Sequence, residues 1–167
     1  PEPLAKVLDK LRTLEIAAEV GLCVPQTWQP RVGEDFAARI ATMRYPLVAK
    51  WANPPEIMPV LERAGLEWLK TDYIRSAQEL TALLDRYAPV GHWPLIQQYC
   101  RGVGLGQMLY TDDGRATVRF QHRRLHEWPP EGGVSTLCRA EPTDAHAAQM
   151  ALSEALLRAL DWQGQAM

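Results

Sequence analysis

The feature that most constrains the fold is a pair of apolar segments on either side of Asp112-Asp113-Gly114. Residues 105–110 and 116–121 have the length of β-strands, and an Asp-Gly pair between two such segments is typical of a tight hairpin. A short apolar segment, Leu95 to Tyr99, precedes them and is separated by Gly102, Gly104 and Gly106. The stretch from residue 94 to 141 therefore predicts consecutive strands of an antiparallel sheet, with a glycine-rich crossing just before it.

The rest of the chain predicts helices and strands in mixed order. Apolar periodicity, capping residues and prolines indicate helices over 3–20, 34–43, 76–87 and from Thr143 onward, and strands over 46–52 and 67–75. This order is α+β, with a smaller helix and strand lobe over residues 1–91 and an antiparallel-sheet lobe with a C-terminal helix over residues 92–167. A cleft between two lobes is the default place for a ligand.

Charge and composition exclude several classes of protein. The 18 Lys and Arg residues and 20 Asp and Glu residues give a net charge of −2, which does not favour a nucleic-acid partner. No apolar run reaches the roughly 20 residues that a membrane span requires, so we expect no membrane partner. Cys23, Cys100 and Cys138 lack the spacing of a zinc or disulfide framework, which favours the cytoplasm, and no other metal-ligand spacing is present.

Lys50 is the most informative single residue. It lies in the apolar strand Pro46 to Ala52, where alternation puts it on the same side as Val48. A lysine is costly to bury unless its ammonium group reaches water or meets an anion, so one interpretation is a phosphate or carboxylate ligand. The other interpretation is an edge strand with Lys50 in solvent, and the sequence leaves both open.

Two further segments carry candidate binding groups. The main chain of residues 95–102 could offer a donor and an acceptor to a flat heterocycle, and Gly102 and Gly104 would allow close approach. The alternative is a strand with a glycine bulge, and the three glycines are not a dinucleotide fingerprint because they precede a strand instead of opening a helix. His122-Arg123-Arg124, before a loop rich in proline and glycine, gathers cations suited to phosphate or carboxylate, or forms a solvated strand end.

Taken together, these segments resemble the ATP-grasp superfamily, and within it the carboxylate-amine ligases related to the carbamoyl phosphate synthase large chain. The resemblance spans nearly the whole chain and rests on the order and distances of four stretches: LDKLRTLEIAAEVGLCVPQT, YPLVAKW, LIQQYCRGVGLGQMLYTDDG and FQHRRLHEWPPEGGVST. It implies an ATP-grasp-like α+β fold that is incomplete in this chain.

The resemblance also implies roles for individual residues. Lys10 and Lys50 would contact the phosphates of ATP from the smaller lobe. Three residues would line the adenine, of which the last two act mainly through backbone atoms: Gln98, Tyr99 and Cys100. Arg123 and Arg124 would lie near the transferred phosphoryl group or the carboxylate substrate, in a reaction that forms an acylphosphate which an amine then captures.

Two departures from the family pattern open alternatives. Val103 and Gly104 stand where many members place an acid for the ribose hydroxyls, and the acidic ligands of Mg²⁺ would lie beyond residue 167. We therefore expect a fragment that is inactive alone, or else a nucleotide-binding or structural module without catalysis. A third possibility is an unrelated α+β domain. The expected partners are ATP, a small carboxylate and an amine, and an exposed sheet edge would allow a homodimer.

Overall fold

The computed structural model describes residues 2–128, 130 and 133–167. The chain divides into two compact units. Unit 1 comprises Pro1–Val7, Arg12–Cys23 and Arg101–Met167, and unit 2 comprises Leu8–Leu11 and Val24–Cys100. This division differs from a boundary at residues 91 and 92, because the strand after that boundary pairs within the sheet of unit 2 and most of the N-terminal helical segment belongs to unit 1.

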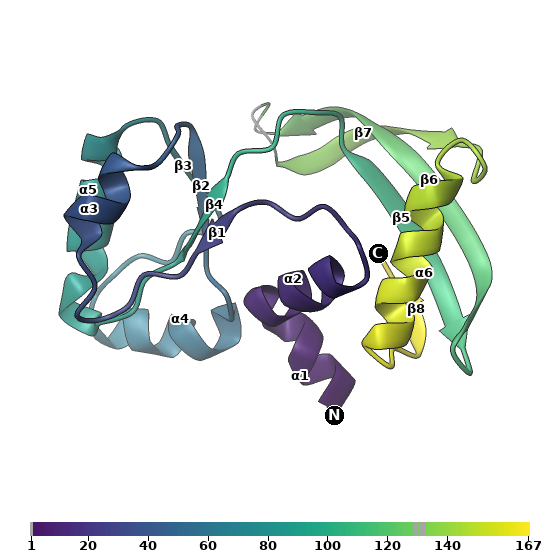
Figure 1. The fold of residues 1–167 in the computed structure, drawn as a ribbon, viewed down its shortest axis with the longest axis horizontal. Helices are drawn as coiled ribbons and strands as arrows, with labels where there is room; N and C mark the ends of the chain where they lie inside the picture. Colours follow the sequence, from purple (N-terminus) through teal and green to yellow (C-terminus); the bar gives the residue numbers. More distant parts are fainter. Residues whose placement is uncertain (1, 129, 131–132) are drawn as a thin grey trace. The chain divides into compact units, whose positions relative to one another are not determined.

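Helices and strands follow one another in mixed order along the described chain (Figure 1). The helices are α1 (Glu2–Leu8), α2 (Lys10–Glu19), α3 (Phe36–Ala41), α4 (Pro54–Arg63), α5 (Ala77–Tyr87) with a 3-10 turn over Ala88–Val90, and α6 (Ala147–Ala159). The strands are β1 (Thr27–Trp28), β2 (Leu47–Lys50), β3 (Asp72–Ile74), β4 (Leu95–Gln98), β5 (Leu105–Asp112), β6 (Arg115–Trp128), β7 (Val134–Glu141) and β8 (Gly164–Ala166). The predicted α+β class is confirmed.

Unit 2 is built on the first sheet, which has the strand order β1-β4-β2-β3 and only antiparallel pairs. One face of this sheet packs on a core of large apolar side chains from the strands and from α4 and α5. Trp93 donates its indole N–H to the carbonyl of Leu84 at 2.7 Å, so the polar atom of this buried ring is satisfied. This core therefore lies against the face of the first sheet that carries Leu47, Ala49 and Ile96.

Local capping explains where the helices of unit 2 begin. Ser76 accepts a hydrogen bond from the Glu79 backbone N–H at 3.2 Å, and the Glu79 carboxylate accepts one from the Arg75 N–H at 2.8 Å. The predicted capping signal at Ser76 is thus confirmed. Asp35 caps α3 in the same way through the Ala38 N–H at 3.0 Å, which places the start of α3 at Phe36.

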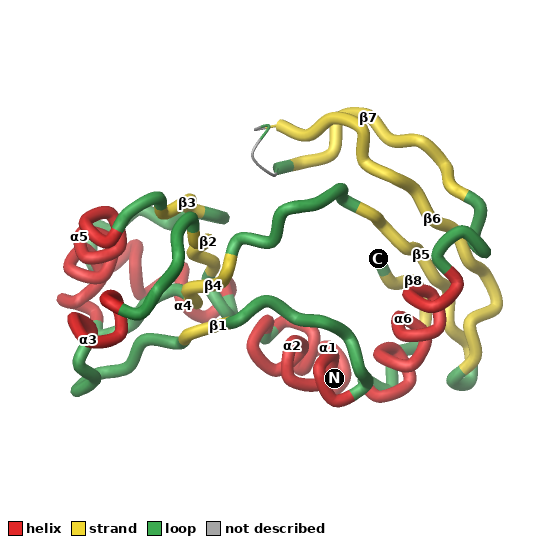
Figure 2. Tube along the Cα trace, turned by 45° about the horizontal axis from the view of Figure 1, so that its top comes forward, coloured by secondary structure: helices red, strands yellow, loops and turns green. Residues whose placement is uncertain are grey.

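Unit 1 is built on the second sheet, with the strand order β7-β6-β5-β8. The predicted hairpin is confirmed, since β5 and β6 pair on either side of Asp113 (φ 48°) and Gly114 (φ 71°). Two successive positive φ angles are the geometry of a type I′ turn, for which Asp-Gly is a preferred pair. Helix α6 lies along one face of this sheet (Figures 1 and 2).

Two helix predictions were wrong in their details. The expected single helix over residues 3–20 is interrupted at Asp9, whose carboxylate accepts a hydrogen bond from the Leu11 N–H at 2.9 Å and so starts α2. The last helix starts after His146, without a side-chain cap, and not at Thr143. No helix of the described residues has the length and apolar character of a membrane span.

Candidate functional site

The lysine face is the side of the first sheet that carries Lys50, and the strand register defines it. Cross-strand neighbours on one face of an antiparallel sheet lie directly opposite each other. Val48 lies opposite Gln97, and Lys50 lies opposite Leu95. By the same register the lysine face consists of Thr27, Val48, Lys50, Tyr73, Leu95 and Gln97. The alternation predicted for β2 is confirmed, because Leu47, Ala49 and Trp51 belong to the core on the other face.

Lys10 is the first residue of α2 and lies close to Lys50 within unit 2. Its backbone N–H donates to the carbonyl of Ala52 at 3.1 Å, which ties the start of α2 to the chain two residues past Lys50. Burial and the charge of Lys50 lower the pKa of Lys10 from its usual 10.5, while Asp9 opposes this shift. The structure thus brings together the two lysines that the resemblance assigns to one ligand.

Neither ammonium group forms an ion pair with a carboxylate among the residues that the structure describes. Two like charges that repel each other are stabilised by an anion placed between or beside them. Lys10 and Lys50 therefore form a site whose electrostatics favour a negatively charged ligand on the lysine face.

Gln97 is a polar residue of this face that the sequence analysis did not select. Its side chain is only 8% exposed, and its amide Nε2 donates to the Thr27 hydroxyl at 3.1 Å. With the amide oriented in this way, its Oε1 is the end that can accept a further hydrogen bond. The signal was present in the sequence, because two-residue alternation from the apolar Leu95 places Gln97, and not Gln98, on the same face.

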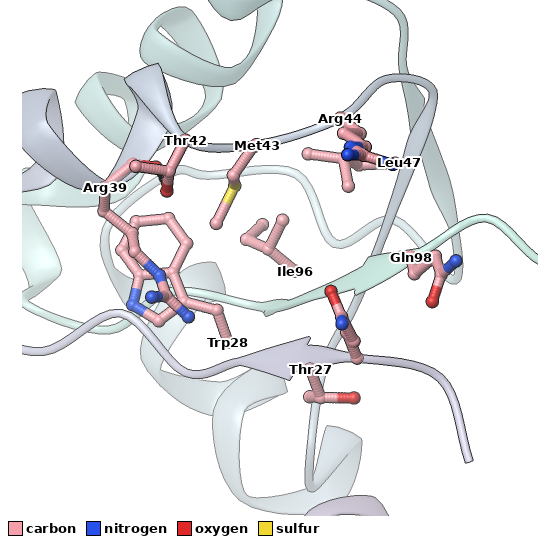
Figure 3. Close-up of a pocket in the computed structure, with 10 residues that line it drawn as sticks. Thr27, Trp28, Arg39, Thr42, Met43, Arg44, Leu47, Ile96 and Gln98 are labelled. Carbon is pink, nitrogen blue, oxygen red and sulfur yellow. Dashed lines mark hydrogen bonds between the residues drawn. The ribbon is translucent and has the colours of Figure 1, made fainter. Parts of the chain in front are cut away.

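Gln98 lies on the other face of the first sheet. It ends β4 opposite Leu47, is exposed, and lines a groove with Ile96 and Met43 (Figure 3). Its backbone N–H donates to the carbonyl of Gln26 at 2.9 Å. The Gln98 side chain is thus separated by the sheet from Lys10 and Lys50.

Tyr99 and Cys100 continue the chain beyond β4. The ring of Tyr99 contacts Tyr73 edge-on, with 6.1 Å between their centroids, so it extends the lysine face. Cys100 is exposed, and its thiol lies 3.9 Å from the carbonyl of Gln98. Of the three residues assigned to adenine, the structure therefore associates Tyr99 most directly with the lysine face.

Arg123 and Arg124 belong to β6 of unit 1 and are each engaged with an acid. Arg123 Nε lies 3.1 Å from Glu141 Oε1, in an ion pair without hydrogen-bond geometry. Arg124 Nη1 lies 3.2 Å from Glu127 Oε1 and 3.4 Å from the carbonyl of Gly133. As consecutive strand residues they extend to opposite faces of the second sheet, so the two guanidinium groups do not form a single cluster. Part of the loop after them, Pro129, Glu131 and Gly132, lies outside the described residues.

Two glycines before the hairpin lie against side chains of β6, and the close approach of a ligand expected at Gly102 and Gly104 stays a prediction. A Cβ atom on Gly104 would lie 2.7 Å from Cδ of Arg124, and one on Gly106 would lie 2.4 Å from the ring of His122. Both glycines therefore make room for side chains of the neighbouring strand, and the structure shows no need to invoke a ligand.

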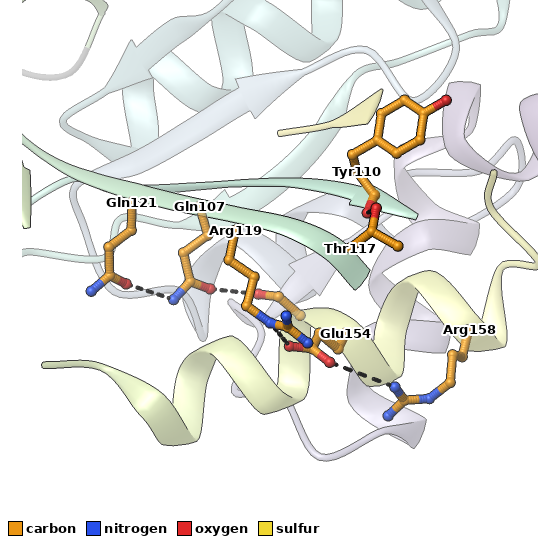
Figure 4. Close-up of polar contacts among 8 residues, drawn as sticks. Gln107, Tyr110, Thr117, Arg119, Gln121, Glu154 and Arg158 are labelled. Atoms are coloured by element: carbon orange, nitrogen blue, oxygen red, sulfur yellow. Dashed lines mark hydrogen bonds and ion pairs between the residues drawn. The ribbon is translucent and has the colours of Figure 1, made fainter. Parts of the chain in front are cut away.

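A polar network anchors β5 and β6 to α6 on one face of the second sheet (Figure 4). Gln107 donates to the buried Gln121 at 3.0 Å and accepts from Ser153 at 2.7 Å. Arg119 lies 2.6 Å from Glu154, a contact that raises the pKa of Arg119 and lowers that of Glu154. These groups satisfy each other, so we regard the network as structural.

Comparisons with known proteins address the fold. Neither a scan of protein-family models nor a search of curated protein sequences found a match. The chain is similar in structure to D-alanine–D-alanine ligase from Bacillus anthracis complexed with ATP, at 16% identity and a TM-score of 0.65, over 98% of this chain and 48% of that one.

Two further solved structures have the same arrangement. L-amino acid ligase from Bacillus licheniformis is 14% identical, with a TM-score of 0.66 over 98% of this chain and 36% of that one. The ADP complex of N5-carboxyaminoimidazole ribonucleotide synthetase is 14% identical, with a TM-score of 0.67 over 98% of this chain and 41% of that one. The chain spans about half the length of these neighbours or less. It has the fold of the corresponding part of the ATP-grasp carboxylate-amine ligases.

Proposed function

We propose that this chain is the ATP-binding portion of an ATP-dependent carboxylate-amine ligase. The observation that supports this most directly is the closeness of Lys10, at the start of α2, to Lys50 of β2 within unit 2. The triphosphate of ATP is an anion that two neighbouring ammonium groups can neutralise. Structural neighbours complexed with ATP and with ADP support the same ligand.

The lysine face also offers groups suited to a purine. The Oε1 of Gln97 can accept a hydrogen bond from an exocyclic amino group, because its Nε2 is held by Thr27. Main-chain groups of Tyr99 and Cys100, just past β4, would supply the second contact that an adenine edge needs. Tyr99 and Tyr73 add aromatic surface on this face. In this proposal Gln98 takes part through its backbone alone, since its side chain lies on the other face.

The proposed reaction joins an acid to an amine. A carboxylate oxygen attacks the γ-phosphorus of ATP, the bond to ADP breaks, and an acylphosphate forms; the amine then attacks the acyl carbon and releases phosphate. Protein groups act mainly by alignment and by neutralising charge. We assign Lys10 and Lys50 to the phosphates, and Arg123 or Arg124 to the transferred phosphoryl group or the acid, in competition with Glu141 and Glu127.

Magnesium is not assigned to residues of this chain. Among the residues that the structure describes, no group of three or more His, Cys, Asp or Glu side chains could hold a metal ion. The described residues therefore do not fit the Mg²⁺ that such a transfer uses. No step of the proposal requires a residue of this chain to bind the metal ion. The three free cysteines favour a reducing compartment, and we place the activity in the cytoplasm.

Calorimetry with ATP and Mg²⁺ tests the proposal. Lys50→Met should raise the dissociation constant of ATP by about 100-fold or more, since one of the two phosphate contacts and its charge are lost. Arg63→Gln removes one positive charge from an exposed residue at the end of α4 in unit 2 and should leave the affinity unchanged. Equal affinity of wild type and Lys50→Met would contradict the assignment.

A second measurement separates the ligase from a nucleotide-binding module. Phosphate release by the product of the complete gene, with mixtures of amino acids as acid and amine, should depend on both substrates. ATP binding without such release under any substrate pair would instead favour the non-catalytic module.

A further inference from the structure

An open groove of about 800 Å³ lies in unit 2, on the other side of the first sheet from the lysine face. Its lining comes from the sheet, from α3 and from the turn after α3, and Met43 is its partly exposed apolar residue, because Trp28, Leu47 and Ile96 are buried in the core (Figure 3). The groove is lined by Gln26, Thr27, Trp28, Arg39, Thr42, Met43, Arg44, Leu47, Ile96 and Gln98. Apart from the Thr27 hydroxyl, which holds the Gln97 amide, nothing in the proposed ligase reaction uses these side chains.

The charge of the groove is entirely positive. No lining residue is acidic, and Arg39 and Arg44 lie toward different ends of the groove (Figure 3). The guanidinium of Arg39 lies 6.0 Å from the centre of the Trp28 ring, a cation–π arrangement that holds it at the groove. Among the described residues neither arginine has an ion-pair partner. An anion at each end would therefore gain a charged contact without displacing an existing one.

The acids that lie nearest to Arg39 in the sequence are committed elsewhere. Glu34 accepts hydrogen bonds from the Trp28 indole at 2.9 and 3.1 Å and from the Arg31 N–H at 3.3 Å. Asp35 caps α3. Both carboxylates thus stabilise the wall of the groove and leave its arginines available.

We propose that this groove binds an extended, acidic peptide segment of another protein, in which two acidic side chains flank apolar ones. The acids would meet Arg39 and Arg44, and the apolar residues between them would lie against Met43. An open groove with charged ends favours an extended segment over a small ligand, which generally needs a site that encloses most of its surface. The site is independent of nucleotide because it lies on the other sheet face.

Fluorescence anisotropy tests this with three fluorescein-labelled peptides, in which two glutamates are separated by one, two or three residues of Ile or Val. We expect saturable binding of at least one peptide, weakened by salt. A peptide with lysines in place of the glutamates should not bind. Failure of all three peptides, or equal binding of the lysine peptide, would overturn the proposal.

Matched variants locate the binding on the chain. Arg39→Gln and Arg44→Gln should each weaken it by about 5-fold or more, and the double variant by about 20-fold. Arg75→Gln removes the same charge from an exposed residue of unit 2 outside the groove and should change it by less than about 2-fold. Circular dichroism melts check that all variants fold. An unaffected double variant that folds would overturn the assignment.

Two controls exclude other occupants. An excess of ATP should not displace the peptide, and displacement would place the peptide on the lysine face and refute the proposal. Sedimentation of the chain without peptide should show no association that depends on Arg39 and Arg44. A dimer abolished by Arg39→Gln/Arg44→Gln would make a second copy the occupant and would also refute it.

Discussion

The cationic residues assigned to the ligase site are built in opposite ways in the two units. In unit 2, Lys10 and Lys50 come from separate segments and lie close together, and burial together with the charge of Lys50 lowers the pKa of Lys10. In unit 1, Arg123 and Arg124 are neighbours in sequence but extend to opposite sheet faces, and each has a carboxylate within 3.2 Å. The lysine pair can therefore accept an added anion, whereas each residue of the arginine pair is already paired with a carboxylate of the chain.

This difference teaches that cationic residues in a sequence do not by themselves identify an anion site. A charge contributes to ligand binding to the extent that it is not already compensated, since a paired arginine must first give up its partner. The run His122-Arg123-Arg124 looked as basic as any part of the sequence. The isolated Lys10 and Lys50, far apart along the chain, are the better-prepared pair.

The largest expected effect compares the two pairs directly by their ATP affinity. Lys10→Met/Lys50→Met should weaken ATP binding by more than about 100-fold, whereas Arg123→Gln/Arg124→Gln should weaken it by less than about 10-fold. The reason is that the lysines lose uncompensated charge, whereas the charges of Arg123 and Arg124 are already compensated by Glu141 and Glu127. Calorimetry at constant salt measures both. A greater loss in the arginine variant would reverse the comparison.

An intermediate effect is expected where the arginine region depends on close packing. Gly106→Ala places a methyl group 2.4 Å from the ring of His122, a side chain only 7% exposed. Overpacking of this kind destabilises by about 1–3 kcal/mol. Urea unfolding measures the change. Gly104→Ala is the matched comparison and should be milder, because its methyl group meets the flexible arm of Arg124. Equal losses would mean that the flexible arm cannot move aside.

The sequence predicted the elements whose signals are local. The Asp113-Gly114 turn and the Ser76 cap depend on the φ preferences and hydrogen bonds of a few adjacent residues, and both were confirmed. The partner of β4 could not be found in this way. Leu95 to Gln98 precede the hairpin in the sequence, yet they pair with β1 and β2, a choice made by burial of both faces of β4 in unit 2.

The same limit applies to the candidate site. The proximity of Lys10 to Lys50 depends on the backbone bond between Lys10 and Ala52, a contact between distant segments that no local pattern encodes. The pairing of Lys10 with Lys50 was predicted from the family resemblance instead. Arg123 pairs with Glu141 of the neighbouring strand β7, so its compensation depends on strand register, whereas Arg124 pairs with Glu127 of its own strand.

The smallest expected effect concerns stability and tests the repulsion in unit 2. Lys50→Gln should raise the free energy of unfolding at pH 7 by a few tenths of a kcal/mol, about the size of a surface like-charge pair. Because the pKa of Lys10 is lowered in the folded state, the unfolded chain binds more protons there, and stability rises with pH from the lowered pKa toward 10.5. The gain from Lys50→Gln should therefore be present at pH 7 and disappear as Lys10 deprotonates.

Urea unfolding at pH 7 and at pH 10 measures this difference, with Lys70→Gln as the exposed control of equal charge change. Anion binding provides a second comparison of the two proteins. Phosphate-bearing anions that bind only the folded state should raise the free energy of unfolding more for the wild type than for Lys50→Gln. If Lys50→Gln instead lowers stability at pH 7, the Lys50 ammonium is already compensated in the folded protein. The contrast between the lysine and arginine pairs would then be lost, because both would carry charges that the chain itself satisfies.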